Sequence, residues 1–254
     1  MGYGRREFLR ALGNGLAVLA ALPLLGFGES SKLHFAQLRY AGDWDPRPLA
    51  YKRLMEAIEM RTSIKVSNKR TILGIGEDRV YEFPFLYITG QGEFPAFTDP
   101  ERQRLRKFLS LGGTLLIDDA SGFSDSPFYR GSVREMAAIF PSRTVQRLPS
   151  THVIYRTFYL LDYASGRKIV KPFLQGLTFT EEERTPVIFC ANDLGGAWSE
   201  DEFGRWRFAC VPGGEAQREA AFRLGVNIAM YTLTGNYKKD KVHEPFIIRR
   251  KRSL

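Results

Sequence analysis

The hydrophobic positions of the chain repeat with two periods, one typical of strands and one typical of helices. Residues 33–40 (LHFAQLRY) alternate between apolar and polar side chains, which predicts a strand. Residues 83–89 (FPFLYIT) form a nearly continuous apolar run, which is typical of a strand covered on both faces. Between them, residues 48–60 carry apolar side chains near helical spacing and predict a helix, and residues 64–66 predict a short strand.

A second helix has the clearest boundaries of any predicted element. It begins at Thr98-Asp99-Pro100-Glu101, which reads as a capping box with a proline in the first turn. Gly112-Gly113 ends it, and residues 114–117 (TLLI) then predict another buried strand. A strand, a helix and a further strand in this order imply a parallel sheet with helices on both faces.

The pattern changes in the second half of the chain. Residues 132–140 and 215–234 predict helices. Three runs read as strands, at residues 153–161, 186–191 and 205–211. The last two runs flank a turn-rich loop, so they can pair as a hairpin. The sequence therefore predicts an α/β fold with a mostly parallel sheet and an added β-hairpin, in a single domain over residues 29–237.

The first 28 residues have the pattern of an export signal. Arg5-Arg6 precedes an apolar run over residues 16–27, and Gly26 and Gly28 lie just before a polar stretch. A basic start, a short apolar run and a small-x-small site are typical of a signal peptide, and paired arginines are typical of the twin-arginine type. The apolar run is shorter than the roughly 20 residues that a membrane span needs. An uncleaved anchor and an ordinary secretory signal with a coincidental arginine pair remain as alternatives.

Export predicts a location in the periplasm or cell envelope, reached through the twin-arginine export machinery. Such a compartment is oxidising and permits disulfides. Cys190 and Cys210 each lie in an apolar, strand-like run. They either pair across neighbouring strands or stay as buried free thiols, because unpaired cysteine is among the most buried residue types.

Composition and charge restrict the class of protein. The chain is 44% hydrophobic and 26% charged, which excludes disorder, collagen and coiled coil as descriptions of all 254 residues. Its net charge of +9 comes mainly from the ends, and residues 238–254 hold seven basic and two acidic side chains. We expect this basic C-terminal tail to be solvated or to touch anionic lipid, nucleic acid or an acidic partner. The body between the ends keeps little net charge, so we expect no nucleic-acid-binding domain.

Polar residues follow the predicted strands at the points where each strand ends. In an open parallel sheet, ligands bind outside the carboxyl ends of the strands. The residues expected to gather there as a ligand site are Tyr40, Asp43, Trp44, Gly90, Gln91, Gly92, Asp118, Asp119, Asn192, Asp193 and Trp198, together with His152. Trp44 and Trp198 are expected to form walls of the pocket.

Each of these groups also has a structural interpretation. The glycines at 90 and 92 either bring backbone N–H groups to an anion or form a tight turn. Asp118 and Asp119 either act as a base or metal ligands, or cap a turn. His152 is either a general base or ligand, or a hydrogen-bonded structural residue. A metal site from these aspartates, His152 and Asp193 is geometrically feasible, but no metal or cofactor motif is present, and we expect neither a metal nor a cofactor.

Several segments occur in the order typical of one bacterial family. FPFLYITGQGEF, TDPERQRLRKFLSLGGTLLIDD, His152, CANDLGGAW and RLGVNIAMYTLTG follow one another along residues 33–237. This succession resembles the domain-of-unknown-function 4159 family, whose members are similar to the class I glutamine amidotransferase-like superfamily. The resemblance implies a flavodoxin-like α/β sandwich. It supplies no activity, and the amidotransferase cysteine has no counterpart because Gln91 occupies the comparable strand exit.

Two functions remain open at this point. The first is a non-catalytic ligand- or protein-binding domain of the envelope, whose ligand docks at the strand ends and is a sugar, another small ligand or a protein segment. The second is a hydrolase acting on a carbohydrate or ester, with His152 paired to Asp118, Asp119 or Asp193, because acid–base catalysis needs groups within hydrogen-bond reach.

Overall fold

Seven strands form one sheet in the order β2-β1-β3-β4-β7-β6-β5. The computed structural model describes residues 32–182 and 184–251, without the side chains of residue 182 and of residues 235–251. The predicted export signal over residues 1–28 therefore lies outside the described residues. Five strands are parallel: β1 (Leu33–Arg39), β2 (Val66–Gly74), β3 (Phe85–Gly90), β4 (Thr114–Asp119) and β7 (Arg184–Cys190). The strands β6 (Gln175–Phe179) and β5 (Gln146–Arg147) extend the sheet in antiparallel pairing.

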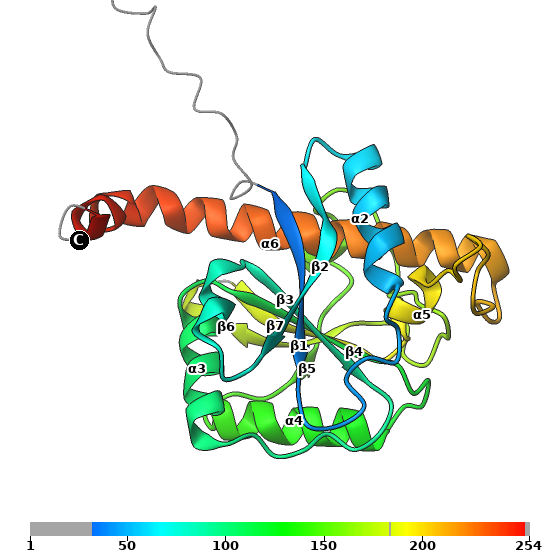
Figure 1. Cartoon of the computed structure of the whole chain (residues 1–254), viewed down its shortest axis with the longest axis horizontal. Helices are drawn as coiled ribbons and strands as arrows, with labels where there is room; N and C mark the ends of the chain where they lie inside the picture. The colour runs from blue at the N-terminus through cyan, green and yellow to red at the C-terminus, as the bar shows by residue number, and fades with distance from the viewer. Residues whose placement is uncertain (1–31, 183, 252–254) are drawn as a thin grey trace, which may run out of the picture. The chain divides into compact units, whose positions relative to one another are not determined.

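Helices cover both faces of the sheet (Figure 1). On one face lie α2 (Ala50–Arg61), α5 (Leu194–Trp198) and α6 (Gly214–Lys251). On the other lie α3 (Asp99–Ser110) and α4 (Pro127–Ile139). Short 3-10 helices occupy Asp78–Glu82, Val153–Tyr155 and Thr180–Glu182. The order of the parallel strands is that of a doubly wound, flavodoxin-like sandwich, so the predicted fold class is confirmed.

The apolar pattern of the sequence explains the two cores. Every residue of β3 and β4 is buried, because helices pack against both faces of these central strands. The capping box at the start of α3 is present: Thr98 accepts from the Glu101 amide, and the Glu101 carboxylate accepts from the Thr98 amide. The predicted first helix of the chain is α2, and the predicted final helix is the first half of α6.

The segment over residues 153–161 is not a strand, although its apolar residues read as one. It forms the 3-10 helix at Val153–Tyr155 and a loop that packs on α6. Asn227 of α6 donates to the carbonyls of Ile154 and Tyr159 and accepts from the Tyr159 amide. These bonds satisfy the loop backbone without a sheet partner, so the apolar side chains cover a helix instead.

The hairpin is built from different segments than the sequence predicts. β6 and β7 are antiparallel neighbours, and residues 205–211 contain no strand. That segment has only isolated bridges, between Glu200 and Trp206 and between Lys168 and Val211. β6 was missed because five residues that include Gly176 give too short an alternation to distinguish from a loop.

The long helix α6 crosses the sheet from one strand end to the other. Gln217 donates to the carbonyls of Gly166 and Arg167 near the carboxyl end of β7, whereas Tyr231 accepts from the Thr185 amide at its amino end. The helix continues to Lys251 and so includes most of the segment predicted as a basic tail. Among the described residues, no helix combines the length and apolar character that crossing a membrane requires.

Substitution of Gly90, the last residue of β3, tests the tight packing at the carboxyl end of the sheet. A Cβ at this position would lie 2.1 Å from the Tyr40 hydroxyl and 2.6 Å from the Phe128 ring, whereas a Cβ at Gly92 would meet nothing within 4 Å. We expect Gly90→Ala to lower the free energy of unfolding by about 1–3 kcal/mol, because the buried rings must move. Gly92→Ala is the matched control and should leave it almost unchanged. Urea unfolding measures both, and equal effects would contradict the packing described here.

Candidate functional site

Two buried carboxylates, Asp118 and Asp193, lie at the carboxyl edge of the sheet between β4 and β7. Asp118 is the fifth residue of β4 and accepts hydrogen bonds from the Leu194 amide at 2.8 Å, the Gly195 amide at 2.7 Å and the Tyr87 hydroxyl at 2.8 Å. The first amides of α5 would otherwise be free to bind an external anion. The protein's own carboxylate therefore occupies that position.

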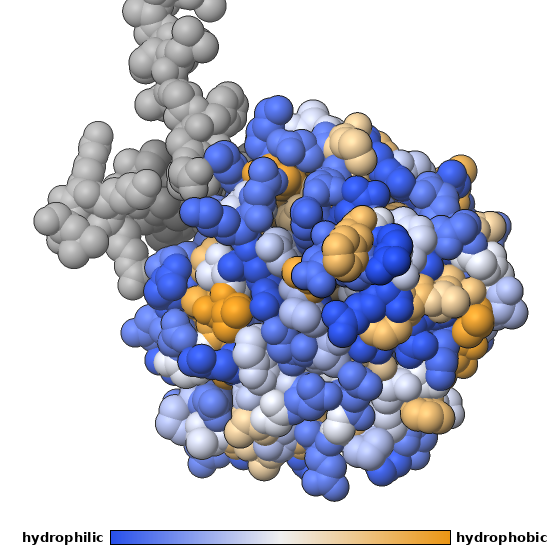
Figure 2. All heavy atoms as spheres, turned by 45° about the vertical axis from the view of Figure 1, so that its right-hand side comes forward, coloured by the Kyte–Doolittle hydropathy of each residue, from blue (hydrophilic) through white to orange (hydrophobic). Residues whose placement is uncertain are grey.

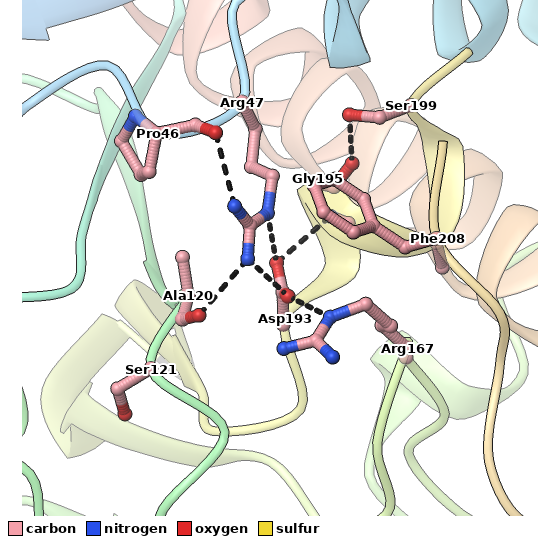
Figure 3. Close-up of polar contacts among 12 residues, drawn as sticks. Pro46, Arg47, Ala120, Ser121, Arg167, Asp193, Gly195, Ser199 and Phe208 are labelled. Atoms are coloured by element: carbon pink, nitrogen blue, oxygen red, sulfur yellow. Dashed lines mark hydrogen bonds and ion pairs between the residues drawn. The ribbon is translucent and has the colours of Figure 1, made fainter. Parts of the chain in front are cut away.

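Asp193 connects three parts of the chain through one carboxylate (Figure 3). It caps α5 by accepting from the Gly196 amide at 2.8 Å, in a left-handed conformation with φ 54° that aspartate tolerates better than most residues. Arg47, in the loop before α2, donates from Nε at 3.0 Å and from Nη2 at 2.7 Å. Arg167 donates from Nε to the same carboxylate. Asp193 is fully buried and Arg47 is 6% exposed, so this is an interior ion pair.

The remaining donors of Arg47 are also engaged. Its terminal nitrogens donate to the carbonyls of Pro46 and Ala120, and its guanidinium lies 4.4 Å from the centre of the Phe208 ring. A buried charge is tolerated only when it is paired and its hydrogen bonds are made. Arg47 meets both conditions and is therefore a structural residue that ties α2 to the ends of β4 and β7.

Asn192 organises the loop over residues 164–171. Its side-chain carbonyl accepts from the amides of Val170 and Lys171, and its amide group donates to the carbonyls of Ala164 and Lys171. Gly166 packs against it, since a Cβ there would lie 2.1 Å from the Asn192 carbonyl oxygen. All of these bonds are internal, so Asn192 shapes the edge and presents no group to a ligand.

Asp119 has the capping role that was one of its two predicted interpretations. Its carboxylate accepts from the Ser121 amide at 2.9 Å and from the Ser126 hydroxyl at 2.6 Å. Ser126 in turn caps α4 by accepting from the Tyr129 amide. The two bonds hold the loop that leads from β4 to α4.

The crevice between β1 and β3 is filled by aromatic side chains. Tyr40 donates its hydroxyl proton towards the carbonyls of Asp43 and Thr89, and its ring lies 5.0 Å from Phe94 and 6.5 Å from Phe128. Burial raises the pKa of Tyr40, with smaller contributions from Asp43 and Asp119. The other predicted site residues of this region differ in exposure. Asp43, Gln91 and Gly92 are exposed, Trp44 is half-buried and Gly90 is buried.

Trp198 does not form a pocket wall. It is fully buried in α5, where its indole N–H donates to the Ala221 carbonyl of α6 at 3.1 Å. Trp44, the other expected wall, is half-buried beside Arg70, whose guanidinium lies 6.0 Å from its ring.

His152 lies at the amino ends of the strands, whereas the carboxylates lie at the carboxyl ends. Its Nε2 is 3.1 Å from the Thr185 hydroxyl at the start of β7, and burial lowers its pKa. Asp118 pairs with Cys190, five residues further along that strand. At about 3.3 Å per residue the separation is roughly 16 Å, so His152 cannot reach these aspartates. No cluster of three or more His, Cys, Asp or Glu side chains suited to a metal occurs among the residues described here.

Both cysteines are buried free thiols, which decides between the two predicted alternatives. Burial raises the pKa of Cys190 well above its ordinary value, and burial also raises the pKa of Cys210. A thiol with a raised pKa carries little of the thiolate that acts as a nucleophile.

The most important partners of the site were not found from the sequence. Arg47 and Asp193 are 146 residues apart, and Arg167 and Phe208 lie in loops without a recognisable motif. The one available signal is that Arg47 stands between two prolines shortly after β1, in DPRP.

Replacing Asp193 tests the energetic role of the ion pair. Asparagine keeps the left-handed backbone and an acceptor oxygen but removes the charge that compensates buried Arg47. We expect Asp193→Asn to lower the free energy of unfolding by about 3–5 kcal/mol. The control is Asp125→Asn, which breaks an exposed pair with Arg130 and should cost less than about 1 kcal/mol. Chemical denaturation compares the two, and a small effect at Asp193 would contradict the assigned role.

Asp118 predicts a specific pH dependence of stability. Burial, and then the charge of Asp193, raise the pKa of Asp118 from 3.8 to about 7. The native state thus binds this proton more tightly than the unfolded state, so stability should fall as the pH rises from about 4 to about 7 and level off above. Asp118→Asn should remove this part of the slope. Unfolding measured over that pH range checks it, and parallel profiles for wild type and variant would refute it.

The family relationship follows from comparison with known proteins. No curated protein matches the chain. The profile of one family, described as a domain of unknown function (DUF4159), matches residues 34–233. This range begins in β1 and ends within α6, so it contains the whole sheet and the network around Asp193. The chain therefore belongs to the DUF4159 family.

Proposed function

We propose that this chain is a non-catalytic binding domain of the cell envelope, and that its ligand contacts the carboxyl edge of the sheet between β4 and β7. The observation that carries the proposal is that the reactive side chains at this edge are already bonded to other groups of the chain. The carboxylates of Asp118 and Asp193 and the amide of Asn192 have only partners within the chain. They form a rigid frame, and a preorganised surface loses little conformational entropy when it binds a ligand.

The hydrolase alternative has no support in the arrangement of side chains. Acid–base catalysis needs a titratable group within hydrogen-bond reach of the reacting atoms. His152 lies at the other edge, beside Thr185, and the thiols of Cys190 and Cys210 are buried. Ser121, at the surface of the edge, accepts from the Phe123 amide, and among the described residues no histidine contacts it.

Side chains at the margin of the frame remain available to a ligand. Phe123, in the loop after β4, is 66% exposed, and Lys168 lies beside it with Nζ 5.3 Å from the ring centre. Arg167 and Phe208 continue this surface on the side of the loop before α6. We call Phe123, Arg167, Lys168, Arg207 and Phe208 the cationic rim.

Export and a peripheral membrane contact are part of the proposal. The proposed export signal rests on the sequence alone, because residues 1–28 lie outside the described part of the chain. β1 begins at the amino edge of the sheet, and α6 passes Thr185 at the same edge on its way towards the basic segment over residues 238–254. Basic segments are attracted to anionic lipid. A contact made through the amino edge would leave the cationic rim facing away from the membrane and open to a ligand.

A ligand screen tests the binding function. The full-length chain is heated with sugars, peptidoglycan fragments and nucleotides, because a ligand of the native state raises the melting temperature. We expect a ligand that stabilises the wild type but stabilises Phe123→Ala less. Leu111→Ala is the control, since Leu111 is similarly exposed at 67% but precedes β4 at the amino edge.

Two outcomes would contradict the proposal. One is a ligand whose stabilisation is lost in Leu111→Ala and kept in Phe123→Ala. The other is hydrolysis of chromogenic ester or glycoside substrates by the purified protein itself, at a rate that contaminating enzymes do not explain.

A further inference from the structure

Three guanidinium groups surround one aromatic ring at the cationic rim. The central guanidinium carbons of Arg47, Arg167 and Arg207 lie 4.4, 5.6 and 5.9 Å from the centre of the Phe208 ring. The carboxylate of Asp193 bonds the first two, and among the described residues no carboxylate pairs with Arg207. The three positive charges around this ring are therefore only partly compensated.

Arg167 has donors left over for a ligand. Only its Nε bonds Asp193, and its two terminal nitrogens carry no bond in Figure 3 and have no hydrogen-bond partner in the described part of the chain. No buried side-chain nitrogen or oxygen there lacks a partner. The terminal nitrogens of Arg167 must therefore reach solvent, and its 16% exposed side chain is fixed by Asp193 in one orientation.

Lys168 adds a further positive charge next to Arg167. Its Nζ would lie 3.0 Å from a Cβ placed on Gly122, so the ammonium group is held over the loop that follows β4. Among the side chains that the structure describes, no carboxylate pairs with it. The backbone amides of Arg167 and Lys168 donate to the carbonyls of Asp193 and Asn192, which fixes the backbone of both residues at the edge.

Elsewhere on the described surface most arginines have a carboxylate partner. Such pairs join Arg53, Arg61, Arg70, Arg79, Arg102, Arg104, Arg130, Arg143, Arg205 and Arg223 to nearby Asp or Glu residues. Contact with an aromatic ring favours a cation only modestly at exposed sites. It does not explain why Lys168 and Arg207 have no carboxylate partner among the described residues, at the edge where this fold class binds ligands.

We propose that the cationic rim binds a phosphate or carboxylate group of a polar ligand. This inference rests on the proposed binding function and adds the class of ligand. The planar, fixed guanidinium of Arg167 suits two oxyanion oxygens, and Lys168 and Arg207 supply charge on either side. The face drawn in Figure 2 is largely hydrophilic, and its apolar residues form small separate patches, so this face offers no broad surface to an apolar ligand.

Pyrophosphate and citrate are the probes that test the inference. Binding to the full-length chain is measured by isothermal titration calorimetry at constant ionic strength. The variant Lys168→Gln/Arg207→Gln removes two charges of the rim and leaves Asp193 paired. The control Arg130→Gln/Arg205→Gln removes two charges from exposed arginines outside the rim. Melting temperatures are measured first, and if the rim variant does not fold, Arg207→Gln alone replaces it.

We expect at least one probe to bind the wild type and the control alike, and to bind the rim variant about tenfold or more weakly, because hydrogen bonds to charged groups are among the stronger ones. Which probe binds distinguishes phosphate from carboxylate recognition. No binding of either probe, or equal weakening in both double variants, would overturn the inference.

The outcomes also separate the inference from the proposed function. A neutral ligand that depends on Phe123 but not on Lys168 and Arg207 would keep the binding function and overturn the anion class. Chemical conversion of a bound anion would instead contradict the non-catalytic function while supporting the anion site.

Discussion

The buried carboxylate of Asp193 is the interaction on which the carboxyl edge of the sheet depends. It receives two arginines and the Gly196 amide of α5, and so fixes the end of β7 against the loop before α2 and the loop at residues 164–171. Bringing these charges out of water costs several kcal/mol per ion, which only close pairing and complete hydrogen bonding offset. The network fulfils that requirement, because no buried polar side-chain atom in the described part of the chain is unpaired.

The same network explains how so many polar side chains are buried at this edge. Two carboxylates at one strand edge repel each other, and here each has a different compensation. Arginines balance the charge of Asp193, whereas Asp118 is bound by peptide amides and the Tyr87 hydroxyl, with a pKa raised by burial. Both carboxylates are thereby committed to joining β4, β7 and α5, and a base free to take a proton from a substrate is left at neither position.

The sequence predicts the strands and helices whose pattern is long and regular. β1, β3, β4, α3 and α6 follow from continuous apolar runs, a capping box and helical spacing. Residues 153–161 mislead because an apolar run that covers a helix reads like a strand, and only the bonds to Asn227 distinguish the two. The positions of Asp118, Asn192 and Asp193 at one edge follow from strand order, but their burial does not. The same holds for Trp198 and His152. Local spacing shows neither that an indole is buried nor at which end of a strand a loop residue lies.

Charge is the property for which the fold adds most to the sequence. Counted along the chain, the positive charge lies at the two ends, and the body has little left. In three dimensions the body is not uniform, because most of its arginines are neutralised by carboxylates on the same or a neighbouring element. In the described part of the chain, Arg207 and Lys168 have no such partners, and they lie beside an arginine whose orientation Asp193 already fixes. The small average charge of the body therefore includes a local excess of positive charge at the cationic rim. The carboxylate of Asp193, which holds this edge together, also fixes the orientation of the Arg167 guanidinium within it.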